Sequence, residues 1–238
     1  MLAPLYNPGV EVPAGKAFGA LSVRDFTTAL ASAEPVPGGG SASAITAALA
    51  AGLVAMVAAL SEGRPRYEQH SRLHAEARAA GQGLAERLLA LADEDAHAYA
   101  RFAAALKLPR ETQEQARARA AAMQAAARGA SEVPLRCVEA CLEVVAAAER
   151  LAGRSNRNAS SDLSVATLLA EASARGAAAN VLVNLPSLAP DDPFGREASQ
   201  QVDGLLQELH RLAEATRSAV LSGTERDPIE PDSTGPAG

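Results

Sequence analysis

Residues 41–60 form an apolar run, SASAITAALAAGLVAMVAAL, that contains no charged side chain and is about as long as a membrane span. Most of its positions, however, hold Ala, Ser, Thr or Gly. Such small side chains gain little free energy from entering lipid, because each carries little apolar area. They also allow neighbouring helices to approach closely. We therefore expect this run to be the buried central helix of a soluble protein, with no membrane partner.

The composition of the whole chain favours helices as well. Hydrophobic residues make up 48% of the 238 residues but aromatic residues only 3%, and alanine is the most frequent apolar type. Alanine is the strongest helix former and a poor strand former. Only residues 180–185 resemble a short strand. We therefore predict an all-α fold, a single-domain bundle of long antiparallel helices.

Clusters of Pro and Gly divide the chain into segments. Residues 1–20 are predicted to form an irregular N-terminal arm, residues 21–222 the helical domain, and residues 223–238 a disordered tail. Gly81 and Gly83 are expected to weaken the helix that contains them, and Pro134 suits the first turn of a new helix. The predicted helices cover residues 22–32, 41–61, 66–106, 112–129, 133–152, 162–174 and 194–222.

The charge and the cysteine content exclude several classes of protein. The net charge is −6 and no long basic run occurs, which argues against a nucleic-acid partner. The two cysteines, Cys137 and Cys141, are too few for a disulfide framework and fit a reducing compartment. The first residues lack the basic start and the apolar core of a signal peptide. We therefore expect a cytoplasmic protein.

Asp95 is the most informative polar residue of the chain. It lies four positions after Leu91 and four before Tyr99, where the helical pattern predicts an apolar residue facing the core. Because burial of an unpaired carboxylate is costly, Asp95 must have partners or face a polar pocket. Buried acids of this kind often transfer protons, but they also serve as structural acids that cap a helix or pair with Arg. The sequence leaves both roles open.

Two further features can bind a ligand. Gly38, Gly39, Gly40 and Ser41 open the apolar helix, where free backbone N–H groups bind anions or carbonyl oxygens. Lys107 follows Asp95 by roughly 18 Å along a straight helix, so the two residues can address opposite ends of one elongated ligand. A tight turn and a lysine near a helix end are also common structural features.

Other polar side chains gather at two later points. Asn158 and Asp162 belong to a polar loop at the start of a predicted helix, and Asn180 and Asn184 share one helical face. His70 and His74 have a spacing that can hold zinc, but no third ligand is placed nearby. We therefore predict no metal site.

Several segments together resemble the C-terminal domain of the formiminotransferase-cyclodeaminase family, which includes bacterial methenyltetrahydrofolate cyclohydrolases. The resemblance covers roughly residues 22–220, and its shared polar features are Gly38–Ala42, Glu94–Tyr99, Lys107–Pro109 and Asn156–Asp162. It implies an all-α homodimer that acts on a tetrahydrofolate derivative, with no tightly bound cofactor.

Two reactions remain open on this resemblance, cyclodeaminase and cyclohydrolase chemistry on 5-formimino- or 5,10-methenyltetrahydrofolate. Both suit a metal-free site, because the methenyl carbon is already electrophilic. The expected catalytic residues are Asp95, which transfers a proton, and Lys107, which holds a carboxylate of the folate tail. The expected substrate-binding residues are Gly38, Gly39, Gly40, Ser41, Asn158, Asp162 and Asn184. The alternative is a non-catalytic helical scaffold or folate-binding protein of the same fold.

Overall fold

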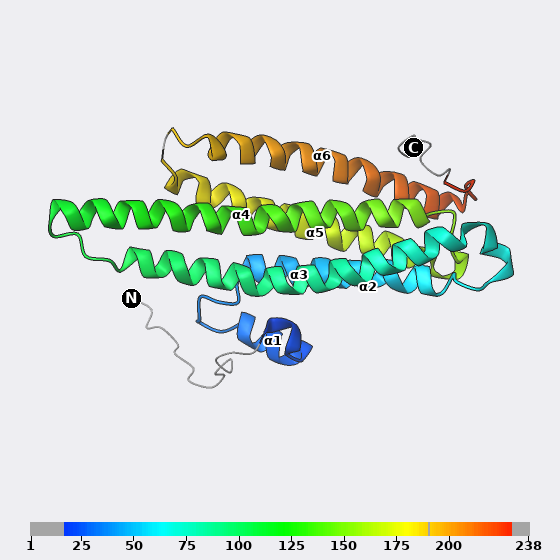
Figure 1. The fold of residues 1–238 in the computed structure, drawn as a ribbon. Helices are drawn as coiled ribbons and strands as arrows, with labels where there is room; N and C mark the ends of the chain where they lie inside the picture. The colour runs from blue at the N-terminus through cyan, green and yellow to red at the C-terminus, as the bar shows by residue number, and fades with distance from the viewer. Residues whose placement is uncertain (1–16, 190, 230–238) are drawn as a thin grey trace, which may run out of the picture.

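The computed structural model describes residues 17–189 and 191–229, and every regular element within these ranges is helical. Five long helices lie side by side and alternate in direction, with a short helix against one flank (Figure 1). The predicted all-α bundle is therefore confirmed. The helices are α1 (Val23–Leu30), α2 (Gly39–Ala59), α3 (Ser71–Leu106), α4 (Gln113–Leu151), α5 (Ser160–Asn184) and α6 (Pro193–Ser222).

Helix α2 is the central helix, packed against α3, α4 and α5. Its buried side is built from small residues such as Ala47, Ala51 and Val54, which lets its neighbours come close. By length and composition α2 is apolar enough to cross a membrane, with a mean hydropathy of 2.0, but half of that stretch is buried inside the bundle. The apolar run predicted as a buried central helix therefore forms α2.

Two glycines mark the closest approaches to α2. A Cβ atom on Gly81 of α3 would lie 2.8 Å from Ala51 O and 2.9 Å from Ala55 N, and one on Gly176 of α5 would lie 2.5 Å from Ser43 Oγ. At Gly81 the two distances are to backbone atoms and are too short for any side chain, so glycine is required there, whereas at Gly176 the contact is only with the hydroxyl end of the Ser43 side chain. Helix α3 is continuous through Gly81, where the sequence suggested a weak point, and α5 continues through Gly176 beyond residue 174, where the sequence predicted its end.

Helix α4 is a single helix of 39 residues that contains Pro134, whereas the sequence predicted two helices with a break before Pro134. Proline has no N–H, so the carbonyl oxygen of Ala130 loses its usual partner in the helix. The side chain of Asn184 on α5 replaces that partner, donating from Nδ2 to Ala130 O at 2.9 Å. A contact from another helix therefore satisfies the interrupted backbone, which local pattern alone does not reveal.

Residues 180–185, the one strand candidate, belong to α5 and the short 3-10 turn that follows it. At the other end of the chain, residues 223–229 do not match the predicted disordered tail. Arg226 N donates to Gly153 O at 3.0 Å, and Arg226 Nη1 donates to Glu149 O at 2.9 Å. These contacts hold the segment against the end of α4. Residues 230–238, like most of the predicted N-terminal arm, lie outside the described residues.

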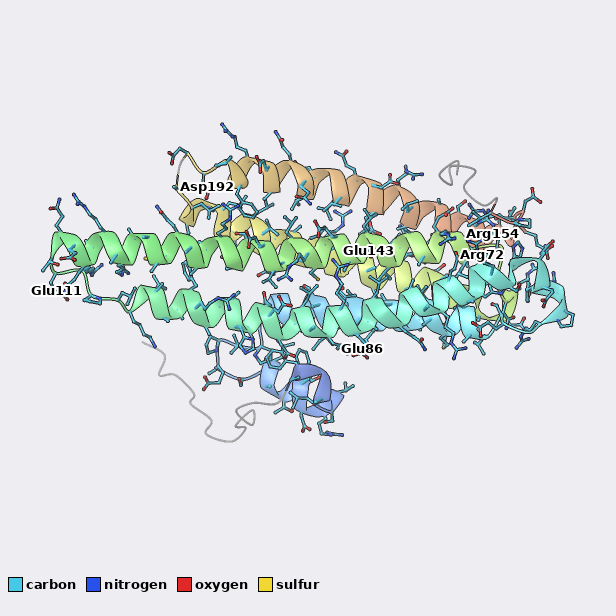
Figure 2. All side chains as sticks on the ribbon, in the orientation of Figure 1. Arg72, Glu86, Glu111, Glu143, Arg154 and Asp192 are labelled. Carbon is cyan, nitrogen blue, oxygen red and sulfur yellow. The ribbon has the colours of Figure 1, made fainter. Side chains whose placement is uncertain are left out.

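The outer sides of α2 and α5 carry apolar side chains that this chain leaves exposed. On α2 these are Leu49, Met56 and Leu60, with 60%, 38% and 42% of their surface accessible. On α5 they include Val165 and Leu168, at 44% and 54%, and near its end Leu182 and Val183. Because α2 and α5 pack against each other, the bundle presents an apolar face along these two helices. In contrast, Figure 2 labels charged residues of α3 and α4, such as Glu86 and Glu143, whose side chains are exposed.

Candidate active site

Asp95 projects from the middle of α3 toward the first turn of α2 and is half-buried. Leu91, one turn earlier, is buried as the helical pattern predicted, but Tyr99, one turn later, is 46% exposed. Steps of four residues drift by about 40° per step around a helix with 3.6 residues per turn. The buried side of α3 therefore passes to Ala98 rather than Tyr99, and Asp95 lies at the margin of the core.

Gly40 is what allows Asp95 to reach α2. A Cβ atom built on Gly40 would overlap the carboxyl group of Asp95, in particular its Oδ1 atom. No other residue fits at position 40 without moving that carboxyl. Two of the three glycines therefore differ in role. Gly40 is buried and makes room for Asp95, whereas the backbone of Gly39 is exposed and accessible to a ligand.

Ser41 is fully buried and makes the polar contacts to Asp95. Its Oγ atom lies 3.2 Å from Asp95 Oδ2 and 2.9 Å from the carbonyl oxygen of Ala92. Ser41 was predicted to bind substrate, but with no accessible surface its hydroxyl cannot touch a ligand. The reason is local, since Ser41 lies on the inner side of the first turn of α2, where α3 covers it.

Burial raises the pKa of the Asp95 carboxyl, and the hydroxyl and backbone of Ser41 partly oppose this rise. The carboxyl also lies at the positive end of the α2 dipole, where Gly38 is the N-cap residue and offers no side-chain acceptor. The neighbouring Glu94 is held away from this pair by Arg136 of α4, whose Nη2 lies 2.5 Å from Glu94 Oε2. Asp95 is thus a carboxylic acid whose proton affinity is increased by its surroundings.

Asn180, rather than Asn184, is the amide next to the glycine turn. A Cβ atom on Gly39 would lie 3.8 Å from Asn180 Nδ2, and this nitrogen donates to Gly176 O at 2.9 Å. Asn184 is one turn further on and directs its Nδ2 to Ala130 O and Asn180 O, both at 2.9 Å. The spacing of four residues identified the pair but not which member faces the turn.

Lys107 is the C-cap residue of α3, and its side chain is exposed. Twelve residues of helix separate it from Asp95, or roughly 18 Å, so the two side chains do not share one contact site. Lys107 therefore lies where α3 ends, ahead of the turn into α4, and Figure 1 shows this turn at one end of the bundle. The structure therefore keeps the predicted separation of the two groups.

Asn158 and Asp162 lie at the opposite end of α2 from Asp95. The loop that holds them is fixed to the end of α2 by Asn156, whose Nδ2 donates to Leu60 O at 3.2 Å. The length of α2 places this loop about 30 Å from Asp95 within one chain. Asn158 lines a hollow there together with Arg64, Pro65, Arg66, Tyr67, Asn156 and Arg157. These two predicted binding residues and Asp95 are therefore not brought together within one chain.

The histidine pair at His70 and His74 lies near that same distant loop. His74 is completely buried, and its Nε2 is 2.8 Å from the carbonyl oxygen of Arg154. The two rings lie 6.2 Å apart between their centroids. Among residues 17–189 and 191–229, no group of three or more His, Cys, Asp or Glu side chains is arranged to hold a metal ion.

The sequence of the whole bundle is similar to proteins of one family. Residues 22–223 match the family model described as formiminotransferase-cyclodeaminase. A methenyltetrahydrofolate cyclohydrolase of Methylorubrum extorquens is 38% identical over 84% of this chain and 96% of that protein. The formimidoyltransferase-cyclodeaminase of Sus scrofa is 36% identical over 80% of this chain, but the match spans only 35% of that longer protein.

A solved structure shares the fold. The crystal structure of formiminotetrahydrofolate cyclodeaminase from Thermotoga maritima matches with a TM-score of 0.77 and 23% identity, covering 86% of this chain and 98% of that one. The family model covers the bundle from the N-cap of α1 to the residue after α6, and so includes Gly40, Ser41 and Asp95. This chain belongs to the formiminotransferase-cyclodeaminase family.

Proposed function

We propose that this protein is an enzyme of folate one-carbon metabolism and that its reaction is the hydrolysis of 5,10-methenyltetrahydrofolate. The observation that carries the proposal is the Asp95 carboxyl, half-buried with a raised pKa against the Gly40–Ser41 turn. The relative with 96% of its length covered is named a methenyltetrahydrofolate cyclohydrolase, which favours this reaction over others of the family.

The chemistry needs one group that accepts and returns a proton. The oxygen of a water molecule forms a bond to the cationic methenyl carbon while Asp95 takes one of its protons. The bond from this carbon to N5 then breaks as the formyl carbonyl forms. N5 receives the proton from Asp95, and the remaining hydroxyl proton leaves to solvent. A carboxyl whose pKa is raised by burial accepts a proton more readily than an ordinary carboxyl and can return it in the second step.

Cyclodeaminase activity is the second candidate, favoured by the formimidoyltransferase-cyclodeaminases among the relatives. In that reaction N10 attacks the formimino carbon of 5-formiminotetrahydrofolate, and the bond from this carbon to the imino nitrogen breaks. Protonated Asp95 gives its proton to the departing nitrogen, and the proton of N10 moves to the same nitrogen, which leaves as ammonia while the methenyl cation forms. Neither reaction requires a Lewis acid, because the carbon under attack is already electrophilic.

The ligand contacts follow from the exposed parts of this site. The backbone of Gly38 and Gly39 and the side chain of Asn180 are the groups proposed to contact the pterin. Lys107, at roughly 18 Å, is proposed to hold a carboxylate of the folate tail.

Asn158 and Asp162 can contribute to the same folate only from a second copy of the chain. They lie about 30 Å from Asp95 within their own chain. A homodimer formed through the apolar sides of α2 and α5 would cover Leu49 and Leu168, which are 60% and 54% exposed. We propose this homodimer. We also propose that the protein is cytoplasmic, because its two cysteines are free, as is usual in a reducing compartment.

The test is the absorbance of 5,10-methenyltetrahydrofolate in the near ultraviolet, which disappears when the bridge opens. The wild-type protein is expected to accelerate this loss, and Asp95→Asn to reduce kcat by roughly a hundredfold or more. Asparagine keeps the shape and an acceptor oxygen next to α2, so circular dichroism and the melting temperature should change little. An Asp95→Asn protein with wild-type kcat would refute the catalytic role of Asp95.

The two reactions are separated by a second assay, release of ammonia from 5-formiminotetrahydrofolate. Ammonia release without hydrolysis would replace the first candidate by the second. A folded protein that binds methenyltetrahydrofolate but accelerates neither reaction would favour the non-catalytic alternative.

A further inference from the structure

We infer that Ser41 is a positioning residue for Asp95. The Ser41 hydroxyl donates its proton to the Asp95 carboxylate when this group is ionised, and it turns to the carbonyl oxygen of Ala92 when the carboxyl is protonated. This inference rests on the proposed function, because it assigns Ser41 a part in proton transfer by Asp95. Ser41 acts through Asp95 and does not touch the substrate.

The geometry supports two alternative hydrogen bonds. A serine hydroxyl has a single proton to donate, yet two acceptors lie within reach of Ser41 Oγ: Ala92 O at 2.9 Å and Asp95 Oδ2 at 3.2 Å. Only one of them can receive the proton at a time. A bond to an ionised carboxylate is stronger than one to a neutral carbonyl, so ionised Asp95 attracts the proton, and neutral Asp95 releases it to Ala92.

Burial makes Ser41 hard to replace. Its side chain has no accessible surface, and no water can stand in for the hydroxyl without displacing packed atoms of α2 and α3. On α3, Asp93 is engaged with the backbone N–H of Phe18 at 2.8 Å, and Glu94 with Arg136 of α4. On α5, the side chain beside the glycine turn is Asn180, which is uncharged. Burial and the contacts to Ser41 are the causes of the altered pKa of Asp95.

The protons balance without any transfer from serine. When Asp95 accepts a proton from water, the Ser41 hydroxyl rotates about its Cβ–Oγ bond from Asp95 Oδ2 to Ala92 O. When Asp95 gives that proton to N5, the hydroxyl rotates back. The Ser41 proton stays on its oxygen throughout, so Ser41 sets the ease with which Asp95 ionises and the orientation of its carboxyl.

The experiment compares Ser41→Ala with Ser43→Ala in the full-length protein. Ser43 lies on the same turn but donates to Gly39 O, within its own helix, at 2.8 Å. The Asp95 carboxyl is titrated by ¹³C NMR, assigned with Asp95→Asn, and kcat is measured against pH with methenyltetrahydrofolate. Loss of the hydroxyl disfavours the charged form, so the pKa of Asp95 should rise further in Ser41→Ala. The rising limb of the kcat profile should move to higher pH, with about a tenfold loss below its midpoint.

Ser43→Ala should leave both measurements unchanged, and Ser41→Thr, which restores a hydroxyl, should return the limb toward the wild-type position. An unchanged Asp95 titration in a folded Ser41→Ala protein would overturn the inference, as would a folded Ser41→Thr protein that behaves like Ser41→Ala. The NMR titration does not depend on turnover. A shifted titration in a protein without hydrolase or deaminase activity would therefore support the coupling while rejecting the proposed function.

Discussion

The two ends of α2 each bury a serine, but in different electrostatic settings. At one end, Ser41 has two acceptors for one proton, and one of them is the titratable carboxyl of Asp95. At the other, Ser61 donates to Val57 O at 2.7 Å and accepts from Asn156 N at 2.8 Å, so its donor and its acceptor are both used by uncharged backbone groups. Fixed, complete pairing is typical of structural polar groups. In contrast, the Ser41 hydroxyl can change its hydrogen-bond acceptor when Asp95 gains or loses a proton.

Among substitutions that test this contrast between the two ends of α2, Gly40→Ala is expected to have the largest effect on stability and on kcat. The added methyl group would overlap the Asp95 carboxyl, so either Asp95 or the start of α2 must move. Overpacking of this kind typically costs about 1–3 kcal/mol in the free energy of unfolding. Displacement of the proton-transfer group should lower kcat at least a hundredfold. Urea denaturation and the ultraviolet assay measure the two effects.

Gly83→Ala is the matched control for this substitution. Gly83 lies on α3, the helix of Asp95, and a Cβ atom there would meet no atom within 4 Å. Alanine in an open helical position should be neutral or stabilise by about 0.5–1 kcal/mol. Equal turnover of Gly40→Ala and Gly83→Ala would show that the close approach at Gly40 does not matter for the reaction.

A smaller effect, confined to stability, is expected at the other end of α2. Ser61→Ala removes the acceptor of the buried Asn156 N–H, which should cost about 1–3 kcal/mol. The pH dependence of kcat should keep its wild-type midpoint, because no titratable partner is lost. A shift of the kcat profile in Ser61→Ala like that expected for Ser41→Ala would erase the distinction between the two serines.

The smallest effect is expected at Asn184, which lies one turn beyond Asn180 on α5 and affects only the stability of the bundle. Asn184→Ala should cost about 1–2 kcal/mol, because Ala130 O loses its partner. In a Pro134→Ala background the restored backbone N–H can pair with Ala130 O, and Asn184→Ala should then cost less. The coupling measured in a double-mutant cycle should be about 1 kcal/mol. Additive costs would contradict the role assigned to Asn184.

Helical periodicity predicted the bundle and most helix limits, because those depend on neighbouring residues. It failed where a distant contact decides the outcome. Pro134 does not end α4, because a side chain from α5 satisfies the free carbonyl. Gly81 does not break α3, and its missing side chain makes room for α2.

The candidate site shows the same limit. The inward position of Asp95 followed from the pattern of α3, but its partner could not, since residues 41 and 95 meet only in three dimensions. The distance of Asn158 and Asp162 from Asp95 depends on the course of the whole chain between them. The choice between Asn180 and Asn184 depends on which turn of α5 meets α2, and spacing within a single helix does not contain that information.

The close helix contact at Gly81 affects the reaction centre, because Asp95 on α3 and the first turn of α2 come from different segments of the chain. The missing side chain at position 81 places the backbone of α2 in direct contact with α3, so that α2 cannot slide along its axis without a clash. A slide of one residue, about 1.5 Å, would be enough to separate Gly40 from the carboxyl above it. Alignment at the reaction centre is thus maintained from a distance, and a larger residue at position 81 would slow turnover without contacting any reacting atom.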